Sequence, residues 1–101
     1  MRPIRVADLV IDAAGQRASR AGTPLALTAI ELRLLTVLAG NAGRALSRAE
    51  LAKRVWRRAP TVGSNLVDVA IWRLRLKLDE PFARKLIHSA RGVGYRFAAD
   101  A

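Results

Sequence analysis

Three cationic residues, Arg73, Arg75 and Lys77, occupy alternate positions in one segment of the chain, and a fourth, Arg91, stands directly before a Gly-Val-Gly turn. Guanidinium groups bond carboxylates and phosphates through paired N–H donors, and they bond the O6 and N7 acceptors of guanine in the same way. The chemistry that these side chains offer is recognition of an anion. The residue types therefore predict binding to a polyanion.

The charge of the whole chain agrees with this prediction. Among 101 residues, 18 are Lys or Arg and 8 are Asp or Glu, which gives a net charge of +10. Residues 1–50 hold 7 basic and 4 acidic residues, whereas residues 51–101 hold 11 and 4. A strongly basic half favours nucleic acid as the partner ahead of a membrane surface. The alternative is a protein whose charge serves only to keep its molecules apart.

Other classes of protein are disfavoured by composition. No apolar run approaches the roughly 20 residues of a membrane span, and the first residues are too interrupted for a signal peptide. The chain has no cysteine, which excludes disulfides and fits a reducing compartment. With His88 as the only histidine and no carboxylate cluster, no metal site, cofactor or catalytic activity is expected. We expect a cytoplasmic globular domain.

The elements that would position the cations can be predicted from local patterns. Residues 4–27 favour a small antiparallel sheet, with extended segments at residues 4–12, 16–20 and 24–27. Thr28 with Glu31, and Ser47 with Glu50, have the spacing of capping boxes, so each pair predicts the start of a helix. The first helix should end at residues 40–43 and the second near Trp56, followed by a loop at residues 57–63.

A third helix is predicted over residues 64–78. At 100° per residue, Ile71, Leu74 and Leu78 fall within about 40° of Val67, and the four residues form the buried stripe. The residues predicted opposite that stripe are Leu66, Val69, Arg73, Leu76 and Lys77. Asp68, Trp72 and Arg75 are predicted on a flank. There Trp72 is either a half-buried packing residue or an exposed aromatic one, and packing is favoured.

Two short helices and a long third one with arginine on its outer face suggest a helix-turn-helix. In that interpretation Arg73 bonds guanine and Val69 meets a thymine methyl group in the major groove. The alternative is an ordinary solvated helix face. The exposed apolar residues Leu66 and Val69 favour contact, because a solvated face does not require them.

A hairpin is predicted over residues 85–97, with the Gly-Val-Gly turn at its tip. The turn lacks the third glycine of a dinucleotide fingerprint, and no helix follows it. The turn therefore predicts either a plain exposed loop or a tip that places Arg91 in a minor groove, where the negative potential attracts arginine.

Four segments together resemble the winged-helix effector domain of OmpR/PhoB-type response regulators: LTAIELRLL (27–35), RALSRAELAKRVW (44–56), SNLVDVAIWRLRLKL (64–78) and KLIHSARGVGYRF (85–97). The segments DEPFARKLIH (79–88) and VADLVID (6–12) are similar to the heavy-metal (copper-type) branch. The resemblance implies an α+β winged helix-turn-helix with a four-stranded N-terminal antiparallel sheet, a three-helix core and a C-terminal β-hairpin wing. One such domain would cover residues 1–101, with the sheet at 4–27, helices at about 28–78 and the wing at 85–97.

The resemblance also implies roles for individual residues. Leu66, Val69 and Arg73 would contact bases, and Arg91 would be the minor-groove wing residue. Asp68 and Trp72 would support the recognition helix, with Asp68 orienting neighbouring cations. The residues that would contact the DNA backbone are Trp56, Arg75, Lys77 and Ser89.

Departures from the family pattern affect the expected contacts and partners. Trp72 stands where the family usually has a phosphate-contacting arginine, and Leu76 replaces a common basic residue. Arg57 and Arg58 lie in the loop that would face RNA polymerase, where relatives often carry acidic and aromatic residues. No receiver domain is recognised in the sequence, so we expect either an excised effector domain or a regulator that cannot be phosphorylated as it stands.

The implied partner is double-stranded DNA, bound on promoter direct repeats by a chain that is a monomer alone and a head-to-tail dimer on DNA. RNA polymerase and an N-terminal receiver domain are further expected partners of the full-length protein. The alternative function is a protein-interaction module that docks polymerase or a receiver domain. RNA binding is less favoured, because five aromatic residues provide no stacking platform.

Overall fold

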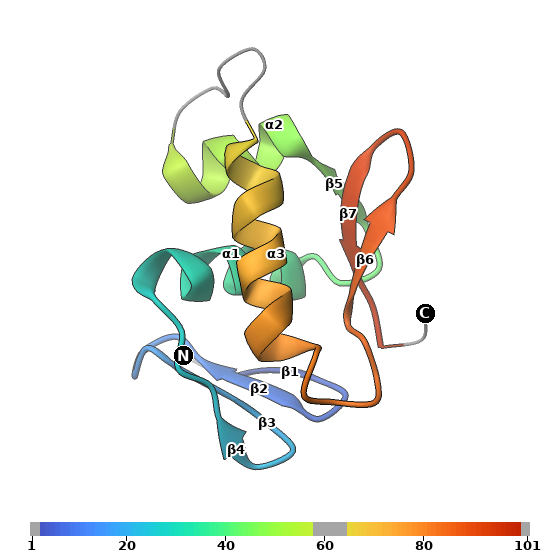
Figure 1. The fold of residues 1–101 in the computed structure, drawn as a ribbon. Helices are drawn as coiled ribbons and strands as arrows, with labels where there is room; N and C mark the ends of the chain where they lie inside the picture. Colours follow the sequence, from blue (N-terminus) through green and yellow to red (C-terminus); the bar gives the residue numbers. More distant parts are fainter. Residues whose placement is uncertain (1–2, 58–64, 100–101) are drawn as a thin grey trace.

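The N-terminal part of the chain forms a four-stranded antiparallel sheet in the order β1-β2-β3-β4. The structure is a computed structural model that describes residues 3–57 and 65–99. Its first sheet lies at the foot of the molecule (Figure 1). The strands are β1 (Ile4–Val6), β2 (Leu9–Asp12), β3 (Arg17–Arg20) and β4 (Thr23–Pro24).

One extended segment predicted for this sheet is in fact a hairpin. Residues 4–12 divide into β1 and β2, which pair with Ile4 opposite Ile11. Ala7, between the strands, has a φ of 53°, a left-handed conformation that turns the chain. The prediction of one continuous strand was therefore wrong, because an alternating apolar pattern does not show a tight turn built on alanine. The four strands implied by the family resemblance are confirmed.

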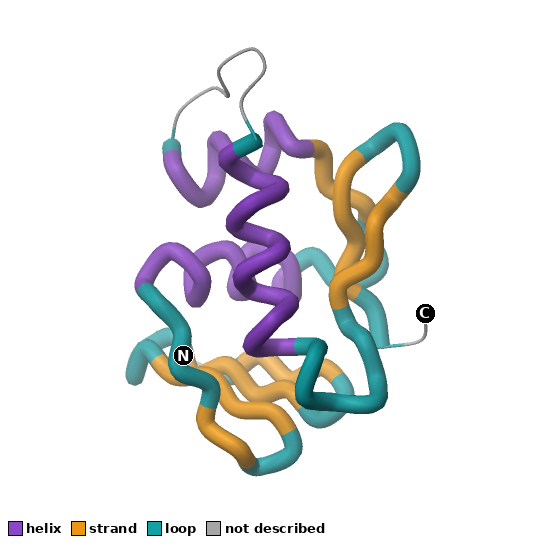
Figure 2. Tube along the Cα trace, viewed as in Figure 1, coloured by secondary structure: helices purple, strands orange, loops and turns teal. Residues whose placement is uncertain are grey.

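Three helical segments stand between this sheet and a C-terminal hairpin (Figure 2). They are α1 (Ala29–Gly40), α2 (Arg48–Leu51) continuing as the π-helical η1 (Ala52–Trp56), and α3 (Leu66–Leu78). The predicted caps are confirmed, since the Thr28 hydroxyl accepts from the Glu31 N–H and Ser47 accepts from the Glu50 N–H. The π-helical turn has no signal in the sequence pattern. Among the described residues no helix is long and apolar enough to cross a bilayer.

A second, three-stranded sheet has the order β5-β7-β6 and carries the hairpin. Its strands are β5 (Ala45–Ser47), β6 (Ile87–Ala90) and β7 (Gly94–Phe97). A side chain at Gly94 would place its Cβ 2.1 Å from the Leu46 carbonyl oxygen. This glycine is therefore required by the close approach of β7 to β5. The short β5 was not predicted as a strand.

The predicted buried stripe of α3 is confirmed: Val67, Ile71, Leu74 and Leu78 all lie in the core. They meet α1 through Leu34, Leu35 and Leu38, and the core also includes Leu9 of β2 and Phe97 of β7. Fully burying an aliphatic side chain stabilises the folded state by about 1.5–3 kcal/mol. One core therefore joins both sheets to the helices, and it fixes the direction in which the opposite face of α3 points.

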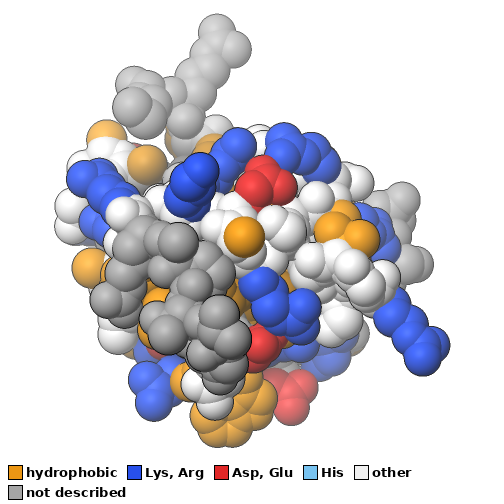
Figure 3. Space-filling view, turned by 90° about the horizontal axis from the view of Figure 1, so that it is seen from above, with side chains coloured by type: hydrophobic (Ala, Val, Ile, Leu, Met, Phe, Trp, Pro, Cys, Tyr) orange, Lys and Arg blue, Asp and Glu red, His pale blue; other side chains and the backbone are white. Residues whose placement is uncertain are grey.

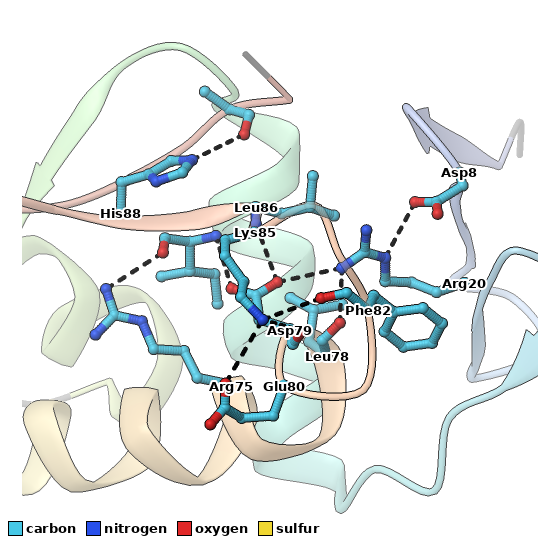
Figure 4. A network of polar contacts seen from close by, with 12 residues as sticks. Asp8, Arg20, Arg75, Leu78, Asp79, Glu80, Phe82, Lys85, Leu86 and His88 are labelled. Atoms are coloured by element: carbon cyan, nitrogen blue, oxygen red, sulfur yellow. Dashed lines mark hydrogen bonds and ion pairs between the residues drawn. The ribbon is translucent and has the colours of Figure 1, made fainter. Parts of the chain in front are cut away.

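A buried polar network ties the C-terminal end of α3 to both sheets (Figure 4). Arg20 of β3 is fully buried, and its Nη1 donates to the Leu78 carbonyl oxygen at 2.8 Å and to Asp79 Oδ1 at 3.3 Å. The Asp79 carboxylate also accepts from the backbone N–H groups of Leu86 at 3.0 Å and Ile87 at 3.1 Å. Asp79 therefore holds β3, α3 and the start of β6 together.

The Arg20 guanidinium has further neighbours. Its Nε donates to Asp8 at 3.0 Å, and its Cζ lies 4.5 Å from the centroid of the Phe82 ring. Its buried Nη2 has no hydrogen-bond partner among the described residues. Removal of a charge from water is costly unless the charge is paired. The ion pairs of Arg20 with Asp8 and Asp79 must therefore offset the cost of burying its guanidinium.

Asp79→Ala should lower the free energy of unfolding by about 3–5 kcal/mol, because it removes a buried ion-pair partner of Arg20 and leaves two backbone N–H groups without their acceptor. Urea denaturation followed by circular dichroism measures this change. Glu80→Ala is the matched control: Glu80 is exposed and pairs only with Lys85 at 3.6 Å, so its loss should change stability by less than about 0.5 kcal/mol. Equal effects of the two substitutions would show that Asp79 is not a structural junction.

Candidate nucleic-acid interface

The outer face of α3 is formed by residues that lie outside its buried stripe. Arg73 is exposed and forms no hydrogen bond or ion pair with the described part of the chain. Leu66 and Val69 are half-buried, so the prediction that both are exposed was wrong. With Thr28, Ile30 and Trp56, these three residues line a cavity of about 360 Å³ between α1, η1 and α3. The structure thus brings the three predicted base-contacting residues onto one surface.

Trp72 does not pack against the protein as predicted. Its side chain is 60% exposed, and Leu76, one turn later, is 44% exposed. On a helical wheel Trp72 lies about 140° from Val67, which turns it away from the buried stripe. The prediction of a half-buried packing residue was therefore wrong.

The N-terminal end of α3 is linked to α2 and to the wing through Asp68. Arg48 Nε of α2 donates to Asp68 Oδ1 at 2.8 Å, and the Tyr95 hydroxyl of β7 donates to the same oxygen. The hydrogen bond from Tyr95 is the main influence that lowers the pKa of Asp68; burial opposes it, and Arg48 adds to it. Burial, followed by the bond to Asp68, raises the pKa of Tyr95. Asp68 therefore forms an ion pair with the cation of Arg48.

Arg75 links α3 to the wing on the same side. Its Nη2 donates to the Ile87 carbonyl oxygen and to Ser89 Oγ, each at 3.3 Å. The guanidinium carbons of Arg48 and Arg75 lie 5.3 and 5.4 Å from the centroid of the Tyr95 ring, within the range of cation–π attraction. Arg75 and Ser89, both predicted to contact phosphates, are thus adjacent on the surface between α3 and β6.

Lys77 and Trp56, also predicted to contact the DNA backbone, lie on the opposite side of α3. Lys77 Nζ pairs with Glu31 of α1 at 2.7 Å, so part of its charge is already neutralised within the protein. Burial alone would raise the pKa of Glu31, but the hydrogen bonds from Lys77 and Thr28 lower it overall. Trp56, at the end of η1, is half-buried against the core.

The loop residues predicted to face polymerase are only partly described. Arg57 is exposed and has a φ of 59°, which ends η1 in a left-handed conformation. Arg58 lies outside the described residues. The structure therefore places one of the two arginines beside the helix-turn-helix, at its surface.

The wing turn presents Arg91 at its tip. Arg91, Gly92 and Val93 are exposed, and Val93 N–H donates to the Ala90 carbonyl oxygen at 2.9 Å. Gly92 has a φ of +80°, which L-residues adopt with strain, so the predicted role of a glycine in turning the chain is confirmed at this position. Arg91 is thus displayed beyond the end of the sheet.

Lys and Arg side chains spread over the end of the molecule where α2, the start of α3 and the wing meet, with acidic side chains among them (Figure 3). Sequence reasoning missed two residues of this surface, Arg48 and Tyr95. Arg48 directly follows the Ser47 cap, so its place at a helix start was the available signal. Tyr95 pairs with Ser89 across the hairpin, and only that register shows that its hydroxyl can reach α3.

The cationic surface formed by α2, α3 and the wing can hold an anion over an extended area, and it offers few groups for metal binding. Within residues 3–57 and 65–99, no group of three or more His, Cys, Asp or Glu side chains could hold a metal ion. His88, the only histidine, lies in β6 and has Nε2 3.1 Å from the Ala98 carbonyl oxygen.

Comparison with known proteins supports the interpretation of this surface as a nucleic-acid interface. The family model described as "Transcriptional regulatory protein, C terminal" matches residues 22–97. The chain is 44% identical over 92 residues to the transcriptional activator protein IrlR of Burkholderia pseudomallei, covering 91% of this chain and 40% of that protein. It is 41% identical over 91 residues to the transcriptional regulatory protein CusR of Escherichia coli, covering 90% and 40%. The chain thus spans about two-fifths of the length of these relatives.

Solved structures show the same fold. The DNA-binding domain of CpxR from E. coli matches with a TM-score of 0.87 at 32% identity, and the alignment covers 100% of both chains. The Klebsiella pneumoniae RstA DNA-binding domain, solved in complex with the RstA box, matches with a TM-score of 0.88 at 32% identity over 98% of this chain and 99% of that one. The predicted winged-helix fold is confirmed.

The Asp68 carboxyl should titrate below 3.8, its ordinary pKa. Because folding lowers this pKa, the contribution of Asp68 to the free energy of unfolding is complete above 3.8 and is lost as pH falls through the lower folded value. Side-chain carboxyl chemical shifts measured against pH follow the titration. Tyr95→Phe and Arg48→Ala should each raise the Asp68 pKa. An unchanged Asp68 pKa in either variant would remove that residue from the causes of the lowered value.

Proposed function

The chain belongs to the OmpR/PhoB family of transcriptional regulators and corresponds to its C-terminal DNA-binding domain, and on this premise we propose how it engages DNA. The third helix enters the major groove, and the wing reaches the adjacent minor groove. Arg73 bonds a guanine edge, Val69 and Leu66 approach neighbouring bases, and Arg75 and Ser89 bond phosphates. The domain acts by binding and carries out no catalytic step.

The observation that carries this proposal is the position of Arg73. It lies opposite the buried stripe of α3, is exposed, and is held by no acidic side chain of the described ranges. A guanidinium with no internal partner keeps its donors for a ligand, and an α-helix fits the major groove. Arg48 and Arg75 flank it on the wing side, so phosphate contacts can fix the register of the helix on the duplex.

The likeness to regulators extends the proposal to the longer protein. Because the chain covers only 40% of IrlR and CusR, we propose that a receiver domain precedes this domain in a longer protein. We also propose that two copies of the chain bind promoter direct repeats head-to-tail. The similarity to CusR supports the predicted heavy-metal (copper-type) branch. We place the protein in the bacterial cytoplasm, where DNA and polymerase are available to it.

Arg73→Ala should weaken binding to a preferred duplex by about 1–3 kcal/mol and relax discrimination at one base pair, because a bidentate contact to guanine is lost. The measurement is fluorescence anisotropy with duplexes selected by the protein from random sequence. Arg5→Ala, which removes an exposed arginine from β1, is the matched control and should change neither value. An equal loss on every sequence would make Arg73 a phosphate contact instead.

Arg75→Ala should weaken binding by a similar factor on all duplexes, because phosphate contacts carry no sequence information. The slope of log K against log salt concentration should fall by about one unit. Circular dichroism must first show that the wing is retained, since Arg75 also donates to Ser89 and to the Ile87 carbonyl oxygen. A folded variant with an unchanged slope would remove Arg75 from the phosphate contacts.

Arg91→Ala should reduce the preference for A·T-rich sequence beside the major-groove site, because a narrow minor groove attracts arginine through its enhanced negative potential. Exchanging the flanking A·T pairs for G·C pairs should weaken the wild-type protein more than the variant. Arg5→Ala again serves as the control, and it should respond to the exchange as the wild type does. The same response from Arg91→Ala would place the wing tip outside the minor groove.

A further inference from the structure

Large hydrophobic side chains are exposed on only two elements of the described structure. Trp72 is 60% exposed and Leu76 is 44% exposed, both on α3, and Val93 in the wing turn is 49% exposed. The four-stranded sheet and α1 expose none of comparable size within the described ranges. All three side chains thus lie on the elements proposed to meet DNA.

Trp72 and Leu76 form a single apolar patch. They are four residues apart on α3, a spacing that makes helix side chains neighbours. Both line a cavity of about 290 Å³ whose remaining walls include the charged side chains of Arg75, Glu80 and Lys85. Arg73 lies three residues before Leu76, also a spacing of neighbouring helix side chains, and it is exposed as well. The patch is therefore continuous with the cationic outer face of α3.

The size of the patch argues against a separate protein interface. A Trp and a Leu exposed to this degree present on the order of 200 Å² of apolar surface. A stable protein interface buries about 800 Å² on each partner, with an apolar centre. The charged rim at Arg75, Glu80 and Lys85 leaves no room for a larger apolar centre here. A small apolar contact within a larger, cationic interface fits these dimensions.

We propose that Trp72 and Leu76 read the methyl groups of thymine on the wall of the major groove. The C5-methyl group of thymine is the apolar group that the base edges present in that groove, and the other bases offer hydrogen-bonding atoms at their edges. An apolar pair beside Arg73 therefore adds selection for thymine next to the guanine that Arg73 bonds. This inference rests on the proposed insertion of α3 into the major groove.

The test compares thymine with deoxyuridine in a duplex selected by the wild-type protein. Deoxyuridine lacks only the methyl group, so every hydrogen bond of the base pair is kept. Single replacements at each thymine should identify one or two positions where the wild-type protein loses binding, by about fourfold for each methyl group buried. Trp72→Ala should bind the unmodified duplex more weakly and should be insensitive to replacement at those same positions.

Two further variants sharpen this comparison. Val93→Ala removes an exposed apolar side chain from the wing, and it should keep the full sensitivity to deoxyuridine at the Trp72 positions. Trp72→Arg exchanges the apolar contact for a cation, so it should lose the thymine preference and raise the salt slope by about one unit. Because Trp72 is exposed, thermal melting should show the same fold for each variant.

The outcomes separate this inference from the proposed function. Equal deoxyuridine effects on the wild type and on Trp72→Ala would overturn the thymine contact, while the Arg73→Ala result would still support major-groove binding. Unchanged binding of Trp72→Ala to one half-site, with weaker cooperativity on two, would assign the patch to a second copy of the chain and also overturn it. If the wild-type protein shows no salt-dependent binding to any duplex, the proposed function and this inference both fail.

Discussion

The ion pair between Arg20 and Asp79 is the constraint on which the rest of the structure depends. Asp79 follows the last turn of α3, and its carboxylate receives Arg20 from the first sheet together with the two N–H groups that begin β6. Replacing such a pair by apolar residues is often tolerated, but removing one partner leaves a buried charge. The pair therefore specifies one arrangement of the sheet, the helix and the wing, since any other would separate the charges in the interior.

Much of the fold could be predicted from the sequence because its signals are local. The caps at Thr28 and Ser47 and the buried stripe from Val67 to Leu78 depend on spacing along one helix, and all were confirmed. The Arg20–Asp79 pair could not be predicted in this way, because its partners are 59 residues apart. The turn at Ala7 and the strand β5 were also missed, since positive φ at alanine and a strand of three residues leave no pattern in composition.

The candidate interface was predictable to a similar degree, and for the same reason. The outer face of α3 follows from helical periodicity, so Val69 and Arg73 were placed correctly opposite the core. The link from Asp68 to Arg48 and Tyr95 joins three elements, and only the tertiary arrangement reveals it. Trp72 was misplaced because apolar character suggested burial, although its wheel position already pointed away from the stripe. Position on the helix was the better guide than residue type.

The polar junctions at Asp68 and Asp79 together affect how the protein recognises DNA. Asp68 fixes the start of α3 to the wing through Tyr95, and Asp79 fixes its end to Leu86 and Ile87, where β6 begins. With both ends held, the spacing between the outer face of α3 and the wing turn is set by the protein before any duplex is bound. Preorganisation of this kind reduces the entropy lost on binding. In the proposed binding mode a duplex would have to adapt its groove spacing to the protein, so sequence-dependent DNA deformability would contribute to specificity at positions that no side chain touches.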